Sequence, residues 1–122
     1  MAGPHLPRVL VLEDEWLIAA QIEAALNAGG YEVIGPVGHI DEALALLNLQ
    51  APDAAVLDIN VHGERSFRVA ERLCEIATPF VFLSGYAENE LPEPMAQRPL
   101  VRKPLAGQAL CRSIDALLPP RI

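Results

Sequence analysis

Short apolar runs rich in β-branched residues alternate along this chain with longer stretches of helical period. Five such pairs follow one another, and no internal repeat interrupts them. Strands that alternate with helices pair as a parallel sheet, because each helix carries the chain back across a face of that sheet. The pattern therefore predicts a doubly wound α/β fold with a five-stranded parallel sheet.

The predicted strands are short, and polar residues end or follow four of the five. They cover residues 8–12, 31–37, 54–58, 80–84 and 100–102. The third strand is apolar without alternation up to Asp58, which is typical of a strand buried on both faces. It should lie near the centre of the sheet.

The predicted helices cover residues 15–28, 41–49, 66–77 and 106–118. Ser66 is placed to cap the third of these with its side chain. Residues 86–99 contain three prolines and favour at most a short or mobile helix. The first helix should have one apolar face, which carries Leu17, Ile18, Ile22, Ala25 and Leu26.

The length of 122 residues suits one domain, expected over residues 1–122 with a core from about 7 to 118. Only four residues follow Leu118, so we expect no output domain. The net charge of −7 opposes binding to nucleic acid or to an anionic membrane. No apolar run approaches the roughly 20 residues that span a bilayer, and residues 1–8 do not resemble a signal peptide. We therefore expect a cytoplasmic protein.

Neither the two cysteines nor the three histidines have the spacing of a zinc site. Cys74 and Cys111 each lie among apolar helical positions, which indicates ordinary core residues that the reducing cytosol keeps unpaired.

Polar side chains stand where four of the five predicted strands end. Glu13 and Asp14 follow the first strand, and Asp58, Ser84 and Lys103 end or follow the third, fourth and fifth. Ligands of open α/β sheets bind outside the carboxyl ends of the strands. We expect these side chains to form one site.

Carboxylates gathered at that edge would repel one another, and the pKa of at least one should rise unless a cation lies among them. Such hard oxygen ligands suit Mg²⁺. We predict Asp14 and Asp58 as direct ligands and the backbone carbonyl of Asn60 as a third. Glu13 would reach the ion through water.

A metal ion beside a carboxylate, an ammonium and a hydroxyl is typical of phosphoryl transfer. Asp58 would be the nucleophile, with Lys103 and Ser84 binding phosphoryl oxygens. Each residue also has an ordinary interpretation: charge at a helix N-terminus for the acidic pair, a turn residue for Ser84, a solvated loop for Lys103. Their joint occurrence at one edge favours the site.

The chain resembles the receiver domain of two-component response regulators, such as CheY. The resemblance lies in residues 11–15 (VLEDE), 56–60 (VLDIN), 83–85 (LSG) and 103–104 (KP). It implies strand order 2-1-3-4-5 and phosphorylation of Asp58 by a histidine kinase or histidine phosphotransfer protein. It also implies a cis peptide bond between Lys103 and Pro104.

One position departs from that family pattern. The strand-five aromatic residue that rotates during the family's switch would lie at Leu100. Residues 79–86 (PFVFLSGY) resemble the FATGUY subgroup, which lacks this aromatic and includes proteins that stand alone. In such a protein the signal would pass through residues 86–99. Family members tune autodephosphorylation through the two positions that Asn60 and Tyr86 occupy in this chain.

Two alternatives remain. A pseudo-receiver would bind a partner without phosphorylation, although the complete set of polar residues argues against it. A phosphatase with an aspartyl intermediate would need Asp-x-Asp after the first strand, where this chain has Glu13-Asp14-Glu15. We therefore expect a signalling switch that catalyses only its own phosphotransfer and dephosphorylation, and no enzyme acting on other substrates.

Overall fold

The computed structural model describes residues 6–84, 99–103 and 107–119. Five parallel strands form one sheet in the order β2-β1-β3-β6-β7. Counted along the chain as the five strands of this sheet, they have the predicted order 2-1-3-4-5. The strands are β1 (Arg8–Leu12), β2 (Glu32–Val37), β3 (Ala54–Asp58), β6 (Phe80–Ser84) and β7 (Leu100–Arg102).

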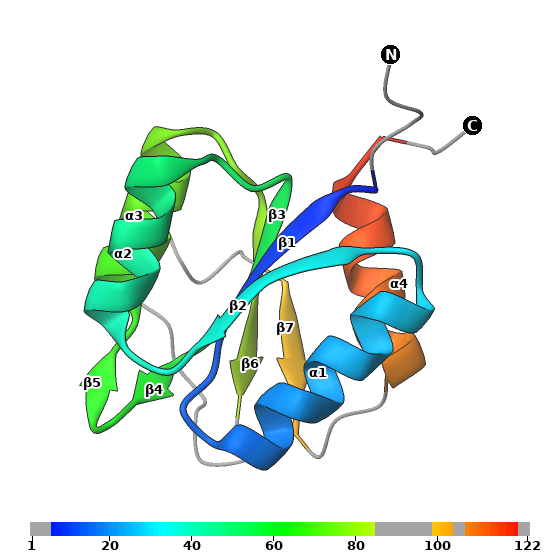
Figure 1. The fold of residues 1–122 in the computed structure, drawn as a ribbon, viewed down its shortest axis with the longest axis horizontal. Helices are drawn as coiled ribbons and strands as arrows, with labels where there is room; N and C mark the ends of the chain where they lie inside the picture. Colours follow the sequence, from blue (N-terminus) through cyan, green and yellow to red (C-terminus); the bar gives the residue numbers. More distant parts are fainter. Residues whose placement is uncertain (1–5, 85–98, 104–106, 120–122) are drawn as a thin grey trace.

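Helices cover both faces of this sheet. Figure 1 shows α2 and α3 on one side and α1 and α4 on the other, which confirms the doubly wound fold. Their bounds are α1 (Trp16–Ala28), α2 (Ile40–Leu49), α3 (Phe67–Glu75) and α4 (Gly107–Leu117). Two apolar clusters, one under each pair of helices, form the core. Among the described residues, no helix is long and apolar enough to cross a membrane.

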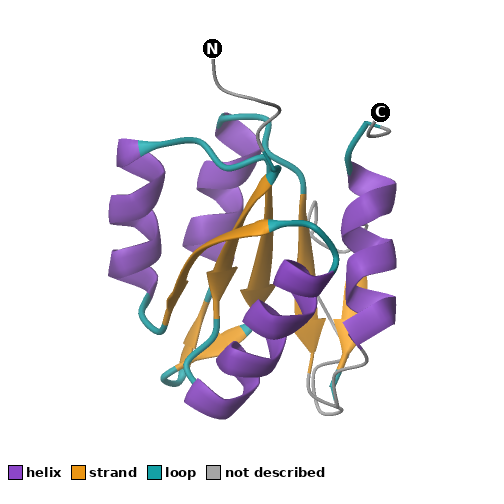
Figure 2. Ribbon diagram, turned by 45° about the vertical axis from the view of Figure 1, so that its right-hand side comes forward, coloured by secondary structure: helices purple, strands orange, loops and turns teal. Residues whose placement is uncertain are grey.

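The carboxyl ends of the parallel strands lie along one edge, as the strand arrowheads in Figure 2 show. β3 and β6 are buried over their whole length, because helices cover them on both faces. The polar residues that follow or end these strands therefore meet at one edge.

A short antiparallel hairpin follows β3, between the predicted third strand and third helix, where no strand was predicted from the sequence. It consists of β4 (Asn60–Val61) and β5 (Glu64–Arg65), with Asn60 paired to Arg65. His62 and Gly63 form the turn, and both have positive φ, 51° and 78°. Left-handed backbone at a histidine leaves no trace in hydrophobic periodicity, so the pattern of the sequence does not predict it.

Three predicted details are wrong. Leu17 is 56% exposed, because it is rotated by about 140° from Ile22 around α1. Ser66 makes no capping bond with its side chain. Its φ of −84° and ψ of 17° lie outside the extended region that a capping residue usually adopts. The third helix ends at Glu75 instead of residue 77, because Ala77 has a left-handed φ of 59°.

The peptide bond between Gly35 and Pro36 is cis and lies at a register shift between β1 and β2. The predicted cis bond before Pro104 and the predictions for residues 86–98 lie outside the described residues. Cys74 and Cys111 form no disulfide bond and are partly buried against the two core clusters, as expected for core cysteines.

Candidate functional site

Three carboxylates converge at the carboxyl edge of the sheet. Glu13 and Asp14 directly follow β1, and Asp58 is the last residue of its neighbour β3. One oxygen from each lies within 4.8 Å of the other two, which is close enough for a single metal ion. The sequence prediction that these residues meet is confirmed.

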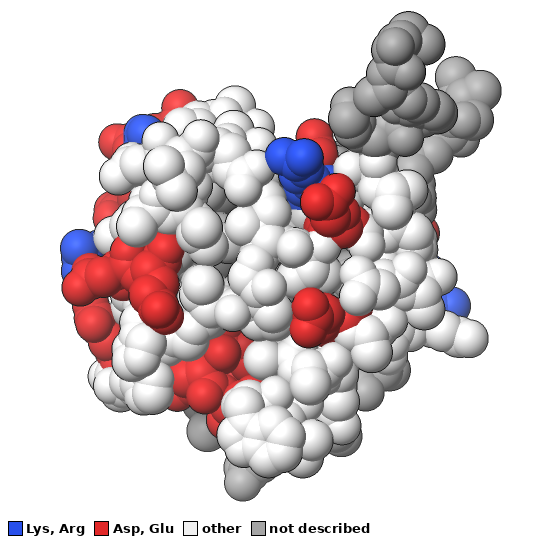
Figure 3. Space-filling model, viewed as in Figure 1, with Lys and Arg blue, Asp and Glu red and all other residues white. Residues whose placement is uncertain are grey.

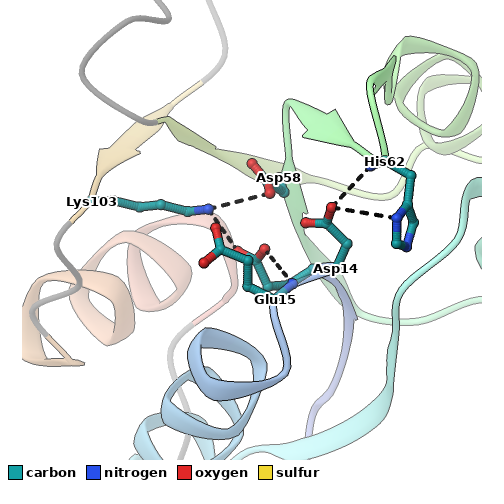
Figure 4. Close-up of polar contacts among 6 residues, drawn as sticks. Asp14, Glu15, Asp58, His62 and Lys103 are labelled. Carbon is teal, nitrogen blue, oxygen red and sulfur yellow. Dashed lines mark hydrogen bonds and ion pairs between the residues drawn. The ribbon is translucent and has the colours of Figure 1, made fainter.

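Lys103 brings a positive charge into this cluster from the end of β7. Its ammonium lies 2.9 Å from Glu13 Oε1 and 3.3 Å from Asp58 Oδ2 (Figure 4). The Lys103 backbone N–H donates to the Ser84 carbonyl at 2.8 Å, which ties the residue to the end of β6. The ammonium therefore bridges two buried carboxylates.

Burial governs the electrostatics of the two carboxylates that face Lys103. Desolvation raises the pKa of Glu13 to about 7, although the Lys103 ammonium opposes this. Desolvation also raises the pKa of Asp58, against the effects of Glu13 and Lys103. The prediction that the pKa of at least one carboxyl would rise is correct. Its predicted cause was repulsion between the carboxylates, whereas burial is the larger cause.

Asp14 behaves in the opposite way. Burial would raise its pKa, yet hydrogen bonds, foremost from the His62 backbone N–H, lower it overall. That N–H donates to Asp14 Oδ2 at 2.9 Å, and the His62 ring nitrogen Nδ1 lies 3.9 Å from the same oxygen. Asp14 is therefore the member of the cluster that most readily carries a full negative charge.

The other two predicted residues lie at the same edge. Ser84 ends β6 and is fully buried, next to Leu83, which pairs with Asp58. Asn60 is exposed and begins β4, two residues after Asp58. Their roles as phosphoryl and metal ligands stay predictions.

Sequence reasoning missed His62 at this site. The spacing of the histidines excludes a zinc site but does not indicate a contact with Asp14, which His62 reaches from the turn of the β4–β5 hairpin. Figure 4 shows Asp14 directed toward His62, and Lys103 directed toward Asp58.

A comparison against known families agrees with the fold. The model of the response regulator receiver domain matches residues 9–115, nearly the whole chain. The chain belongs to this family. It is the receiver domain of a two-component response regulator, and such domains interact with kinases or phosphotransfer proteins.

Similar curated proteins are response regulators. The transcriptional regulatory protein PdtaR of Mycobacterium tuberculosis is 31% identical over 87 residues, which are 70% of this chain and 42% of that protein. The sensory transduction protein LytT of Bacillus subtilis is 31% identical over 69% of this chain and 36% of its own length. The chain thus spans between 25% and 42% of the length of the curated relatives it matches.

Solved structures match over almost the whole chain. SdrG of Sphingomonas melonis superposes with a TM-score of 0.83 at 34% identity, covering 94% of this chain and 98% of that one. The response regulator PhyR of Brucella abortus superposes with a TM-score of 0.77 at 30% identity, covering 93% of this chain and 48% of its own. This chain therefore covers nearly all of the first solved chain and about half of the second.

Proposed function

We propose that this receiver accepts a phosphoryl group on Asp58 with the help of Mg²⁺. The observation that carries the proposal is the convergence of three carboxylates within 4.8 Å beside the Lys103 ammonium. A structural ion pair needs only one carboxylate for each ammonium. The surplus negative charge favours a divalent cation.

The donor set fits Mg²⁺. Asp14 and Asp58 offer hard carboxylate oxygens, Asn60 a carbonyl, and Glu13 a carboxylate for a water ligand. The raised pKa values of Glu13 and Asp58 describe the protein without a cation, and a bound cation would lower both. When bound, Mg²⁺ would neutralise one oxygen of the phosphoryl group.

Three residues of the chain would then have separate roles in phosphoryl transfer. An Asp58 carboxylate oxygen attacks the phosphorus of a phosphohistidine, the P–N bond breaks, and the imidazole leaves as a phosphoaspartate forms. The Lys103 ammonium, 3.3 Å from Asp58, would bind a second phosphoryl oxygen and the Ser84 hydroxyl a third. Burial strengthens these contacts, because water does not screen them.

In this proposal the phosphodonor is a histidine kinase or a histidine phosphotransfer protein, and phosphorylation switches binding to a further protein. The chain acts on no other substrate. Leu100 occupies the position of the family's rotating aromatic and is 36% exposed, so another element would transmit the change. Location in the cytoplasm stays a prediction.

The test is to incubate the protein with Mg²⁺ and acetyl phosphate and to measure its intact mass. We expect one added phosphoryl group on the wild type and none on Asp58→Asn or after chelation of Mg²⁺. Asp41→Asn is the matched control, because Asp41 is 91% exposed on α2. An unmodified wild type would contradict the proposal and favour a pseudo-receiver that binds partners without phosphorylation.

A further inference from the structure

Two histidines from different elements stack beside the carboxylate cluster. His39 immediately precedes α2, and His62 lies in the turn of the β4–β5 hairpin. Their rings are nearly parallel, with centroids 4.4 Å apart and an angle of 14° between planes. The contact joins the loop after β2 to the loop after β3.

The stack includes His62, whose backbone conformation is unfavourable by itself. His62 has a φ of 51°, a left-handed conformation that residues with a Cβ adopt rarely. Such conformations persist where surrounding contacts hold them. The His39 ring is such a contact, because it packs directly on the side chain of the strained residue.

This backbone conformation directs the His62 N–H toward the carboxylate cluster. The His62 N–H donates to Asp14 Oδ2 at 2.9 Å, so one oxygen of a predicted metal ligand has a fixed partner. A ligand held by such a bond loses fewer orientations when it binds a cation, and removal of outer partners commonly weakens metal binding by 10–100-fold.

The imidazoles themselves are poor candidates for ligands. Among the described residues, the only group of three or more potential ligands with mutually close atoms is Glu13, Asp14 and Asp58. Two stacked parallel rings also direct their nitrogen lone pairs along separate planes, away from a shared ion. The histidines act on the site through Asp14.

We propose that the His39–His62 stack positions Asp14 for the divalent cation, by holding the His62 N–H on its carboxylate. The proposal rests on the proposed function in that the cation is Mg²⁺. It adds two positioning residues that neither the motif nor the metal-ligand set contains.

The first measurement needs no metal. Amide hydrogen exchange of His62 is compared between the wild type, His39→Ala and His39→Phe in the presence of a chelator. We expect faster exchange in His39→Ala, because the stack that holds the hydrogen bond is lost. His39→Phe keeps an aromatic ring and should retain the protection. Equal protection in all three proteins would overturn the proposal.

The second measurement is Mg²⁺ affinity, followed by fluorescence of Trp16. This residue is the single tryptophan of the chain and lines a groove of about 320 Å³ together with Glu13 and Asp14. We expect affinity to fall about tenfold in His39→Ala and to recover in His39→Phe. Asn48→Ala, an exposed substitution elsewhere on α2, should leave it unchanged.

A double-mutant cycle separates positioning from general destabilisation. If both rings act through one stack, His39→Ala with His62→Ala should weaken Mg²⁺ binding no more than either substitution alone. Multiplied losses, or affinities that follow only the free energy of unfolding, would contradict the proposal. A wild type that does not bind Mg²⁺ would refute the proposed function and the positioning of a cation ligand, whereas exchange at His62 would still report whether the stack holds the hydrogen bond.

Discussion

At Glu13, burial and the neighbouring Lys103 ammonium act in opposite directions on the pKa of the carboxyl. Its carboxyl is buried, and its pKa is about 7 compared with 4.5 for an ordinary glutamate. The folded protein therefore binds a proton more tightly than the unfolded chain between these two values. Asp58, with a raised pKa, contributes with the same sign.

We predict that, without Mg²⁺, the free energy of unfolding decreases as pH rises from about 4.5 to about 7. The loss should be on the order of 1–3 kcal/mol, since one pKa unit corresponds to 1.36 kcal/mol. Glu13→Gln should flatten this dependence, whereas Glu71→Gln, exposed on α3, should not. Urea unfolding at several pH values measures it, and the same slope in Glu13→Gln and wild type would contradict the assignment.

At the scale of elements, α1 shows how the prediction of an apolar helix face can be wrong at one residue. Ala19, Ile22 and Leu26 are its buried residues, whereas Leu17 is 56% exposed. We predict that Leu17→Gln changes the free energy of unfolding by less than about 0.5 kcal/mol. Ile22→Ala should lower it by about 2–4 kcal/mol, because it leaves a cavity in the core. Chemical denaturation compares them, and a similar cost for both would mean that Leu17 is also buried.

The packing of α1 against α4 depends on a glycine. A methyl group at Gly29 would lie 2.7 Å from Cys111 Sγ, although the φ of −82° suits any residue. We predict that Gly29→Ala destabilises the protein by about 1–3 kcal/mol through overpacking. In a Cys111→Ala background the same substitution should cost less, because the clashing sulfur is gone. An unchanged cost in that background would show that the contact between the helices is not the cause.

At the scale of the whole molecule, the topology and the gathering of Glu13, Asp14, Asp58 and Lys103 were predictable from sequence. Both follow from local signals: the alternation of strand and helix periods, and the polar residues at strand ends. The left-handed turn at His62 was not predictable, because it depends on a contact with a distant loop. The dominance of burial in the pKa of Glu13 likewise depends on packing that no local pattern encodes.

The charge distribution of the molecule determines how salt affects its stability. Figure 3 shows acidic side chains over α2 and between α2 and the start of α1, in a chain with net charge −7. Any salt therefore stabilises the protein somewhat by screening repulsion. A specific binding site adds further stabilisation. A cation that binds only the folded state raises the free energy of unfolding by about 2.7 kcal/mol when its concentration is one hundred times its Kd.

We predict that Mg²⁺ raises the free energy of unfolding beyond NaCl of equal ionic strength, and that Asp14→Asn loses this excess while keeping the response to NaCl. The reason is that screening acts on all carboxylates together, whereas coordination requires the Asp14 oxygen that lies within 4.8 Å of Asp58 and Glu13. Urea titrations in matched salts measure both effects. An equal gain from Mg²⁺ in wild type and Asp14→Asn would mean that the ion acts on the overall charge, and that the carboxylate cluster is not its binding site.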